Sequence, residues 1–317
     1  MDASLLILGT GAMACLFAAR LAAAGARVTM LGSWEEGLEA LGKHGVGLIE
    51  TEGTEGFYAV GAVNDPNLCR GLPYALVLVK SWQTQRAARQ LAECLPQDGL
   101  ALTLQNGLNN YQTLANALGE ERVALGVTTS GAYLEQAGVV RAVGSAAVSL
   151  GVHPRLSPLA DMLEKAGFKV TIETDLRTLV WGKLVINAAI NPLTALLRVP
   201  NGELLERPTA RTLMGMTALE TATIAKAQGI SLPYPDAVAA VEEVARRTAE
   251  NYSSMLRDVL RGAPTEVDAI NGAVVHTGEQ IRMPTPLNQA LFLLVKAMVY
   301  SHIAQTGALN PIAPSFT

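Results

Sequence analysis

Hydrophobic and polar positions in the first half of the chain follow two alternating patterns. Short apolar runs, of the length of buried strands, are separated by longer segments with the 3.6-residue repeat of a helix. The runs predict strands at 4–8, 27–31, 75–79, 100–104, 123–129 and 169–172, and antiparallel strand material at 139–150 around a Gly144-Ser145 turn signal. The repeats predict helices at 13–24, in the segment that ends near Pro96, and at 156–167. Strands that alternate with helices indicate a parallel sheet covered on both faces.

After about residue 174 the pattern is helical throughout. Long helical repeats cover 175–198, 208–229, 235–261, 264–280 and 286–306, and clusters rich in Gly and Pro separate them. No segment of this half has the alternation of a strand. We therefore expect an α/β domain at residues 1–173 and an all-α domain at residues 174–317.

Composition supports two domains and excludes several classes of protein. The chain has 317 residues, half of them hydrophobic, which fits two domains of about 150 residues each. The net charge of −4 is dispersed, with no basic block of the kind that binds nucleic acid or an anionic membrane. The three cysteines are far apart, which predicts a reducing compartment, and the four histidines lack metal-ligand spacing, so we expect no metal site.

Residues 4–31 are apolar enough to suggest a signal peptide or a membrane span. A signal peptide starts with a basic region, and a span needs about 20 apolar residues with few charges. This segment has no basic start and is interrupted by Gly9, Gly11, Arg20, Gly25 and Arg27. We therefore expect neither a leader nor a span here, and a cytoplasmic location.

A glycine-rich turn follows the first predicted strand and opens the first predicted helix. It consists of Gly9, Thr10, Gly11, Ala12, Met13 and Ala14, which fits the GxGxxG/A fingerprint of dinucleotide-binding sheets. In that fingerprint the first glycine allows the tight turn and the second admits the pyrophosphate, while the third small residue lets the helix pack on the sheet. The first domain is thus predicted to be a Rossmann-type doubly wound sheet that binds a dinucleotide. The alternative is a Gly-rich turn without a ligand.

The end of the second predicted strand bears on the choice between NAD and NADP. An NAD site usually has an acidic residue there, to hold the ribose 2′-hydroxyl. This chain has Ser33 and no acid until Glu35, which permits a 2′-phosphate, although no arginine stands at that point. We expect NADP(H), with NAD(H) not excluded.

Two further loops follow predicted strands, where ligands of open α/β sheets bind. Lys80 lies in the first loop and is a candidate for a cofactor phosphate or ribose, and Asn106 lies in the second and is a candidate for nicotinamide or substrate. The alternatives are a solvated lysine and a simple Asn-Gly turn.

A polar stripe runs along the apolar helix predicted at 175–198. Lys183, Asn187 and Asn191 are each four residues apart, so they share one helix face. An ammonium in an apolar setting has a lowered pKa, which suits a general acid or base, and the two amides could orient a hydroxyl or carbonyl. The alternative is a solvated stripe, but asparagine is a poor residue for a helix interior.

Polar groups also cluster farther along the helical half. Asn251, Ser254 and Asp258 have spacings that put them on one face of a helix. Glu266 and Asp268 follow Pro264 at an expected helix start, where they are either site residues or acids that stabilise a helix N-terminus.

These stretches together resemble the ketopantoate reductase (2-dehydropantoate 2-reductase) family. The matching segments are GTGAMA at 9–14, LVKSWQT at 78–84, LQNG at 104–107, WGKLVINAAINPLTAL at 181–196, VPNGEL at 199–204 and NYSSMLRDVLRGAPTEVDAINGAVV at 251–275. The resemblance implies a Rossmann domain joined to a helical domain, with the active site between them. It implies reduction of 2-dehydropantoate by NADPH to (R)-pantoate, on the route to pantothenate and coenzyme A.

The resemblance also implies a role for individual residues. Lys183 matches the catalytic lysine, which as an ammonium would protonate the developing alkoxide, and Glu266 matches a glutamate near cofactor and substrate. Lys80 and Ala132 match positions that contact the cofactor. The substrate-contacting positions match Asn106, Asn187, Asn191, Asn201 and Ser254, to which the local spacing adds Asn251. Ser33 departs from relatives that have an arginine there for the 2′-phosphate.

Two other functions use the same residues. The chain could reduce another small 2-keto acid or an imine, because pockets vary on a shared scaffold. It could instead be a non-catalytic NADP(H)-binding sensor, although a sensor has no need of a proton donor at Lys183. A homodimer is possible because the long apolar helices offer an interface.

Overall fold

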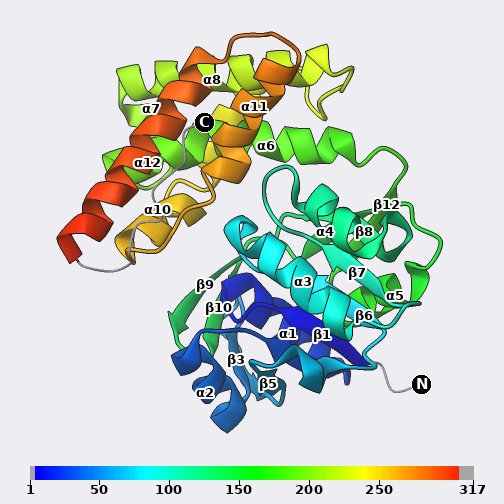
Figure 1. Ribbon diagram of the computed structural model, residues 1–317. Helices are drawn as coiled ribbons and strands as arrows, with labels where there is room; N and C mark the ends of the chain where they lie inside the picture. The colour runs from blue at the N-terminus through cyan, green and yellow to red at the C-terminus, as the bar shows by residue number, and fades with distance from the viewer. Residues whose placement is uncertain (1–3, 307–317) are drawn as a thin grey trace. The chain divides into compact units, whose positions relative to one another are not determined.

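The computed structural model describes residues 4–306, and the chain divides after Leu176 into two compact units (Figure 1). The ends of the expected domains, residues 1–3 and 307–317, lie outside the described residues. The first unit holds the strands and the second is helical, which confirms the predicted fold class.

The first unit is built on an eight-stranded sheet in the order β12-β11-β8-β7-β6-β1-β2-β5. The strands from β8 to β5 run parallel, whereas β11 is antiparallel to β8 and parallel to β12. The bounds are β1 Ser4–Leu8, β2 Arg27–Leu31, β5 Gly61–Val63, β6 Tyr74–Val77, β7 Leu100–Thr103, β8 Val123–Thr128, β11 Ala147–Gly151 and β12 Lys169–Glu173. The predicted strands are thus confirmed, and the central ones form the expected parallel sheet.

Helices cover both faces of this sheet because successive side chains of each strand point to opposite faces. Leu5 and Ile7 of β1 join one core with α1 (Ala12–Ala23) and α5 (Ser157–Lys165). Leu6 and Leu8 join the other core with α3 (Thr84–Cys94) and α4 (Asn110–Leu118).

A second, four-stranded sheet packs on the other side of α1. Its order is β4-β3-β10-β9, with bounds β4 Glu55–Tyr58, β3 Val46–Ile49, β10 Val139–Val143 and β9 Gly131–Gln136. Val140 and Ala142 of β10 join the α1 core, whereas β11, which follows the Gly144 turn, pairs with β8 in the large sheet. The strand material expected at 139–150 is therefore shared between two sheets, although both strands contribute to the same core, in which Val148 and Leu150 of β11 join Val140 and Ala142 of β10.

The second unit packs around α6 (Arg177–Leu197), whose Val185, Ala189 and Leu193 lie in its core. The other helices are α7 Glu203–Glu206, α8 Pro208–Ala227, α9 Ala237–Arg247, α10 Ser254–Leu260, α11 Ala273–Gln280 and α12 Pro286–Thr306. By length and composition α6 could cross a membrane, but most of it is buried in the protein, as in the core helix of a globular domain.

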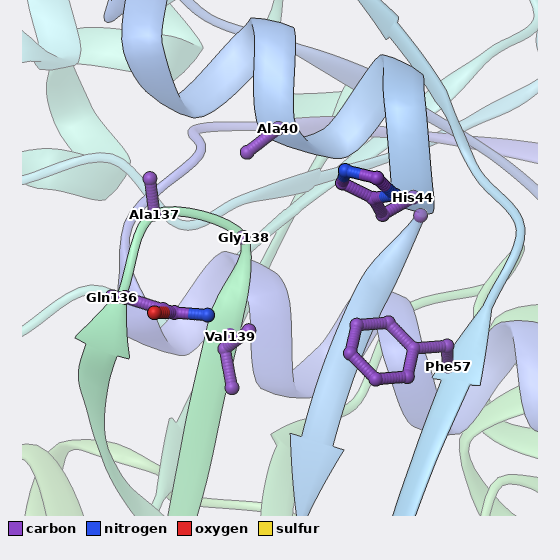
Figure 2. Close-up of a pocket in the computed structure, with 8 residues that line it drawn as sticks. Ala40, His44, Phe57, Gln136, Ala137, Gly138 and Val139 are labelled. Carbon is purple, nitrogen blue, oxygen red and sulfur yellow. The ribbon is translucent and has the colours of Figure 1, made fainter.

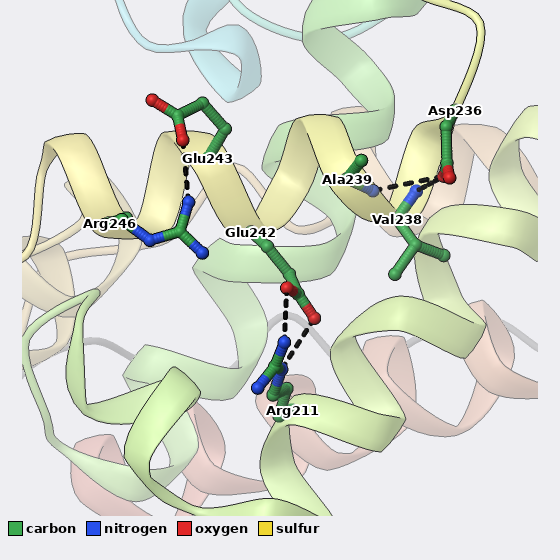
Figure 3. Close-up of polar contacts among 7 residues, drawn as sticks. All are labelled: Arg211, Asp236, Val238, Ala239, Glu242, Glu243 and Arg246. Carbon is green, nitrogen blue, oxygen red and sulfur yellow. Dashed lines mark hydrogen bonds and ion pairs between the residues drawn. The ribbon is translucent and has the colours of Figure 1, made fainter.

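The prediction of a single helix at 235–261 is wrong, because this segment forms two helices, α9 and α10. Asp236 caps α9 by accepting from the backbone N–H groups of Val238 and Ala239, and α9 is joined to α8 by the Arg211–Glu242 ion pair (Figure 3). After α9 the carbonyls of Ala249 and Asn251 accept from the turn at 201–202 instead of continuing a helix. These long-range bonds and the N-cap of α10 at Ser253 outcompete the local helical pattern.

The helix expected at 264–280 also differs from the structure. The segment begins with irregular backbone, forms a five-residue π-helix (η4, Asp268–Gly272), and becomes α-helical only at Ala273. A π-helix inserts a residue into the helical ladder and changes which side chains face inward.

Candidate active site

The glycine loop lies where the carboxyl ends of β1, β2 and β6 meet. Gly9 has a φ of +123°, and its N–H donates to the carbonyl of Leu31 at the end of β2 at 2.8 Å. On the other side, the N–H of Leu78 donates to the carbonyl of Leu8 at 3.0 Å. A Cβ on Gly9 would lie 3.2 Å from the carbonyl oxygen of Leu78, so both its conformation and its neighbours require glycine.

Gly11 differs, because nothing in its own fold requires glycine. Its φ is −83°, and a Cβ built there would meet nothing within 4 Å. It is the N-cap of α1, so the backbone N–H groups of the first helical turn point outward beside it. Open space beside a helix N-terminus fits the pyrophosphate of a dinucleotide, which is the role that the fingerprint gives to the second glycine. The loop residues therefore fit the expected cofactor.

A partly buried hydrogen-bond network joins the two loops that carry Lys80 and Asn106. Gln105 Nε2 donates to the carbonyl of Val79 at 2.9 Å and to Thr84 Oγ1 at 2.8 Å. Asn110 Nδ2 donates to the carbonyl of Asn106 at 2.8 Å, and Asn110 Oδ1 lies 2.8 Å from Thr84 Oγ1. These bonds fix the backbone beside Lys80 and Asn106 at one edge of the sheet, which is the arrangement expected of ligand-binding loops.

Ser33 at the end of β2 has a partner that sequence reasoning missed. Arg86 of α3 donates from Nη1 to Ser33 Oγ at 2.9 Å, although the two residues are 53 positions apart. No local pattern could reveal this pair, because it depends on β2 and β6 ending at the same edge of the sheet. Ala132, the remaining candidate for cofactor binding in this unit, lies on β9 and packs beside α1.

The polar stripe lies on α6, as predicted. Asn191 is buried, while Lys183 and Asn187 are half-buried among apolar neighbours. Burial lowers the pKa of Lys183 to about 8, and the carboxylate of Glu266 partly offsets this by favouring the ammonium. Glu266 is itself buried, in the segment between α10 and η4. Lys183 therefore gives up its proton more readily than an exposed lysine does, and the Glu266 carboxylate moderates this effect.

Asn201 and Asn251 are brought together by their backbones, because the N–H of Asn201 donates to the carbonyl of Asn251 at 3.0 Å. Asn201 Nδ2 donates to Thr248 Oγ1 at 2.9 Å. Asn201 Oδ1 is buried and accepts no hydrogen bond from the described residues. A buried acceptor without a donor is costly, so a ligand hydroxyl would suit this position.

The prediction that Asn251, Ser254 and Asp258 share one helix face is wrong for Asn251, because this residue precedes α10. Ser253 caps this helix by accepting from the N–H of Leu256, and it also accepts from Thr194 Oγ1 of α6 at 2.7 Å. That buried serine anchors α10, whereas Ser254 is exposed on its first turn. The physical reason is that the Ser253 cap makes the helix begin at Ser254, so Asn251 lies outside it.

A shallow pocket of the first unit contains none of these residues. Figure 2 shows it between the end of α2 (Glu35–His44), β4 and the turn from β9 to β10, where His44 and Phe57 face the hollow. Its lining is mainly alanine, glycine, valine and phenylalanine, without paired acid and base groups. It therefore lacks the chemistry of an active site.

The glycine loop and the polar stripe define a class of protein: a nicotinamide-dependent oxidoreductase with an α/β unit and a helical unit. Comparisons with known proteins give the family. Residues 5–155 match the family model described as ketopantoate reductase PanE/ApbA, and residues 175–299 match its C-terminal counterpart. The chain belongs to the ketopantoate reductase family, and it is an oxidoreductase with a Rossmann-like unit.

Individual relatives cover nearly the whole chain. The 2-dehydropantoate 2-reductase of Halobacterium salinarum is 33% identical over 91% of this chain and 96% of its own length. That of Archaeoglobus fulgidus is 34% identical over 92% and 96%. Among solved structures, a ketopantoate reductase of Ralstonia eutropha has a TM-score of 0.88 at 30% identity and covers 94% of this chain and 99% of its own. D-mandelate dehydrogenase with NADH and anilino(oxo)acetate also has a TM-score of 0.88, at 25% identity over the same shares.

The two glycines of the loop give a matched pair of variants. Gly11→Val should leave the unfolding midpoint nearly unchanged, because the site of its Cβ is empty, but should weaken binding of NADP⁺ or NAD⁺ at least about tenfold by filling the cradle. Gly9→Val should lose both stability and binding, because its φ is positive and Leu78 is close. Thermal unfolding and isothermal titration calorimetry measure the two effects. Unchanged dinucleotide affinity in Gly11→Val would contradict the placement of the cofactor.

Proposed function

We propose that the chain reduces the ketone of 2-dehydropantoate to (R)-pantoate with NADPH, on the route to coenzyme A, with Lys183 as the general acid. The observation that carries this proposal is the polar stripe of α6, in which a half-buried lysine lies in an apolar helix beside the carboxylate of Glu266. Family membership and the names of the full-length relatives support the reaction.

Each group has a chemical task. The nicotinamide cofactor, when bound, supplies hydride to the ketone carbon. The Lys183 ammonium stabilises the negative charge that develops on the ketone oxygen and gives it a proton. Asn187 and Asn191 lie one and two turns farther along the same face and can hold the oxygen and the hydroxyl groups. Glu266 keeps a larger fraction of Lys183 protonated than burial alone would allow.

The remaining candidates divide between cofactor and substrate. The residues of the first unit, Gly9 to Ala14, Ser33, Lys80, Asn106 and Ala132, would hold the cofactor, and Asn106 would also reach the substrate. Asn201 offers a buried acceptor to a substrate hydroxyl, its backbone is bonded to that of Asn251, and Ser254 follows three residues later at the start of α10. An acceptor without a donor favours a substrate that brings its own hydroxyl, as 2-dehydropantoate does.

Reduction of a different 2-keto acid is the second candidate function. D-mandelate dehydrogenase, whose structure was solved with NADH and anilino(oxo)acetate, has the same fold at 25% identity. Turnover of NADPH and of NADH on a panel of 2-keto acids separates the two functions. A kcat/KM for 2-dehydropantoate far above that for aryl 2-keto acids would support the first proposal, and the reverse order would support the second.

Lys183→Ala should lower kcat by about 10²–10⁴-fold, the usual contribution of a general acid, while NADPH affinity changes little. The matched control is Lys226→Ala, which removes an exposed lysine of α8 from the same unit and should keep full activity. Absorbance of NADPH with and without 2-dehydropantoate gives kcat, and titration calorimetry gives affinity. Near-normal turnover of Lys183→Ala would exclude its role as the acid.

The pH profile follows from the pKa of Lys183. Proton donation needs the ammonium, so kcat/KM should be level below pH about 8 and fall about tenfold per pH unit above it. Because the carboxylate of Glu266 raises this pKa, Glu266→Gln should move the fall to lower pH. Glu279→Gln, which removes an exposed carboxylate of α11, should leave the profile in place. A profile that rises with pH through this range would point to Lys183 acting as a base.

The homodimer and the cytoplasmic location stay predictions. Four large apolar side chains are exposed on two helices of the second unit, namely Met216, Leu219, Leu293 and Leu294. Exposed apolar side chains on neighbouring helices are what an interface between two copies would bury.

A further inference from the structure

Arg86 lies at the point where cofactor preference is decided in dinucleotide-binding sheets. Its guanidinium donates to Ser33 Oγ at 2.9 Å, and Ser33 stands just past the end of β2. In such sheets an acid at this point selects the ribose 2′-hydroxyl of NAD, and a nearby arginine accommodates the 2′-phosphate of NADP. We propose that Arg86, reaching across from α3, is the residue that recognises the 2′-phosphate, with Ser33 as its partner.

The local charges make this cation necessary. Glu35 and Glu36 occupy the first turn of α2, and only Trp34 separates them from Ser33. Two carboxylates would repel a phosphate, so a 2′-phosphate needs a compensating positive charge beside Ser33. Guanidinium groups bind phosphate through paired, charge-assisted hydrogen bonds, and the Ser33 hydroxyl can donate to the same oxygens.

The hydrogen bonds between the start of α3 and the loop after β7 hold Arg86 in place. α3 begins at Thr84, which accepts from Gln105 Nε2, so the start of the helix is tied to the loop after β7. Arg86 lies on the first turn of this anchored helix, and its side chain is exposed toward the edge of the sheet where β2 ends. A cation held on a fixed helix terminus loses less freedom on binding than one on a mobile loop.

Binding of the intact protein to NADP⁺, NAD⁺, adenosine 2′,5′-bisphosphate and AMP tests this inference, which rests on the proposed use of NADPH. Arg86→Gln should weaken binding of the two 2′-phosphorylated ligands at least tenfold and change NAD⁺ and AMP less than twofold. Arg89→Gln, which removes the same charge one turn farther along α3, should weaken them much less. Titration calorimetry gives all four constants without turnover.

The possible results distinguish the role of Arg86 in binding the 2′-phosphate from the proposed reduction of 2-dehydropantoate. An unchanged ratio of NADP⁺ to NAD⁺ affinity in Arg86→Gln would overturn the role of Arg86, even if the enzyme reduces 2-dehydropantoate. A wild-type protein that does not favour the 2′-phosphate would overturn it too, while leaving reduction with NADH possible. Failure to reduce 2-dehydropantoate would contradict the proposed function and leave the binding result standing.

Asn271 fills a gap in the hydrogen bonding of α6 next to Pro192. Pro192 lies inside this helix and has no N–H, so the carbonyl of Ala188 loses its normal helical donor. Asn271 Nδ2 donates to that carbonyl at 3.0 Å from η4. Asn271 is fully buried, and its amide oxygen has no partner among the described residues, so it serves here as a donor.

The position of this bond connects the two segments that carry the proposed acid and its carboxylate. Ala188 lies on α6 between Asn187 and Asn191. Asn271 follows Glu266 in the chain and lies in the π-helix η4. Without the extra residue of the π-helix the side chain at 271 would face elsewhere. We propose that Asn271 is a positioning residue that holds α6 in register with the segment of Glu266, and so sets the geometry between Lys183 and Glu266.

A buried chain of bonds fixes Asn271 in turn. Its Nδ2 also donates to Asn288 Oδ1 at 3.0 Å, and Asn288 Nδ2 donates to Glu220 Oε1 at 2.9 Å and lies 3.1 Å from Thr221 Oγ1. Glu220 accepts as well from the backbone N–H groups of Leu287 and Asn288 at the start of α12. The amide is therefore held by α8 and α12 while it contacts α6.

Glu266 is the carboxylate that acts on Lys183, and most of the acids on the elements packed against α6 have partners of their own. Asp258 of α10 pairs with Arg261, Asp268 of η4 with Lys296, and Glu242 of α9 with Arg211. Glu203 of α7 pairs with Arg207, and Glu220 of α8 holds the start of α12. A change in register between α6 and η4 would therefore change the protonation of Lys183 mainly through Glu266.

Substitutions at three positions test this role, which rests on Lys183 as the acid. Asn271→Leu should lower kcat at least tenfold and move the fall of kcat/KM to lower pH, because Glu266 then supports the ammonium less, while NADP⁺ affinity stays within twofold. Thr221→Val removes a bond of the same buried network without touching Ala188. It should lower the unfolding midpoint but leave the pH profile in place.

Pro192→Ala provides the decisive control, because it restores an N–H for the carbonyl of Ala188. In the Asn271→Leu background it should restore both kcat and the pH profile, and where Asn271→Leu alone does not fold, the double variant should. A double variant that stays impaired, or an Asn271→Leu enzyme with a normal profile, would overturn the positioning role. Inactivity of wild-type enzyme on 2-dehydropantoate would instead contradict the proposed function.

Discussion

The helical unit depends on the conflict between an apolar helix and the ammonium it carries. α6 is surrounded by other helices, and most of its length is buried, so any charge on it loses hydration. Lys183 meets this cost by a lowered pKa and by the nearby Glu266 carboxylate, rather than by full exposure. The same environment that makes the lysine expensive in stability lowers its pKa toward neutrality, which is what the proposed role as proton donor requires.

The first unit is governed by a similar constraint on α1. That helix lies between two sheets and is buried along most of its length, so half of its twelve residues are alanine and its one charged residue, Arg20, is paired with Glu50. Small residues let both sheets approach it closely, and its N-terminus is left free at the glycine loop. Burial of the helix body therefore fixes the position at which its unpaired backbone N–H groups meet an anion.

Local sequence patterns predicted the elements that bury a face but not those defined by distant partners. The central strands, such as 4–8 and 75–79, were predictable because strands covered on both faces are apolar runs. The strands β3, β4 and β5 were not, because they are three or four residues long and contain Gly47, Gly56 and Gly61. The break before α10 depends on the Ser253 cap and on bonds to the turn at 201–202, which lies about fifty residues earlier.

The site follows the same division between local and distant determinants. Spacing alone placed Lys183, Asn187 and Asn191 on one face, because a helix repeats its geometry from turn to turn. Spacing could not pair Ser33 with Arg86 or Ala188 with Asn271, because each pair forms only after the chain has folded. Both pairs compensate for a local deficiency: a strand end without a cation, and a carbonyl that faces a proline. In the proposed scheme these contacts between elements set the cofactor preference and the register of the stripe, so a single position such as Ser33 is a poor guide to either.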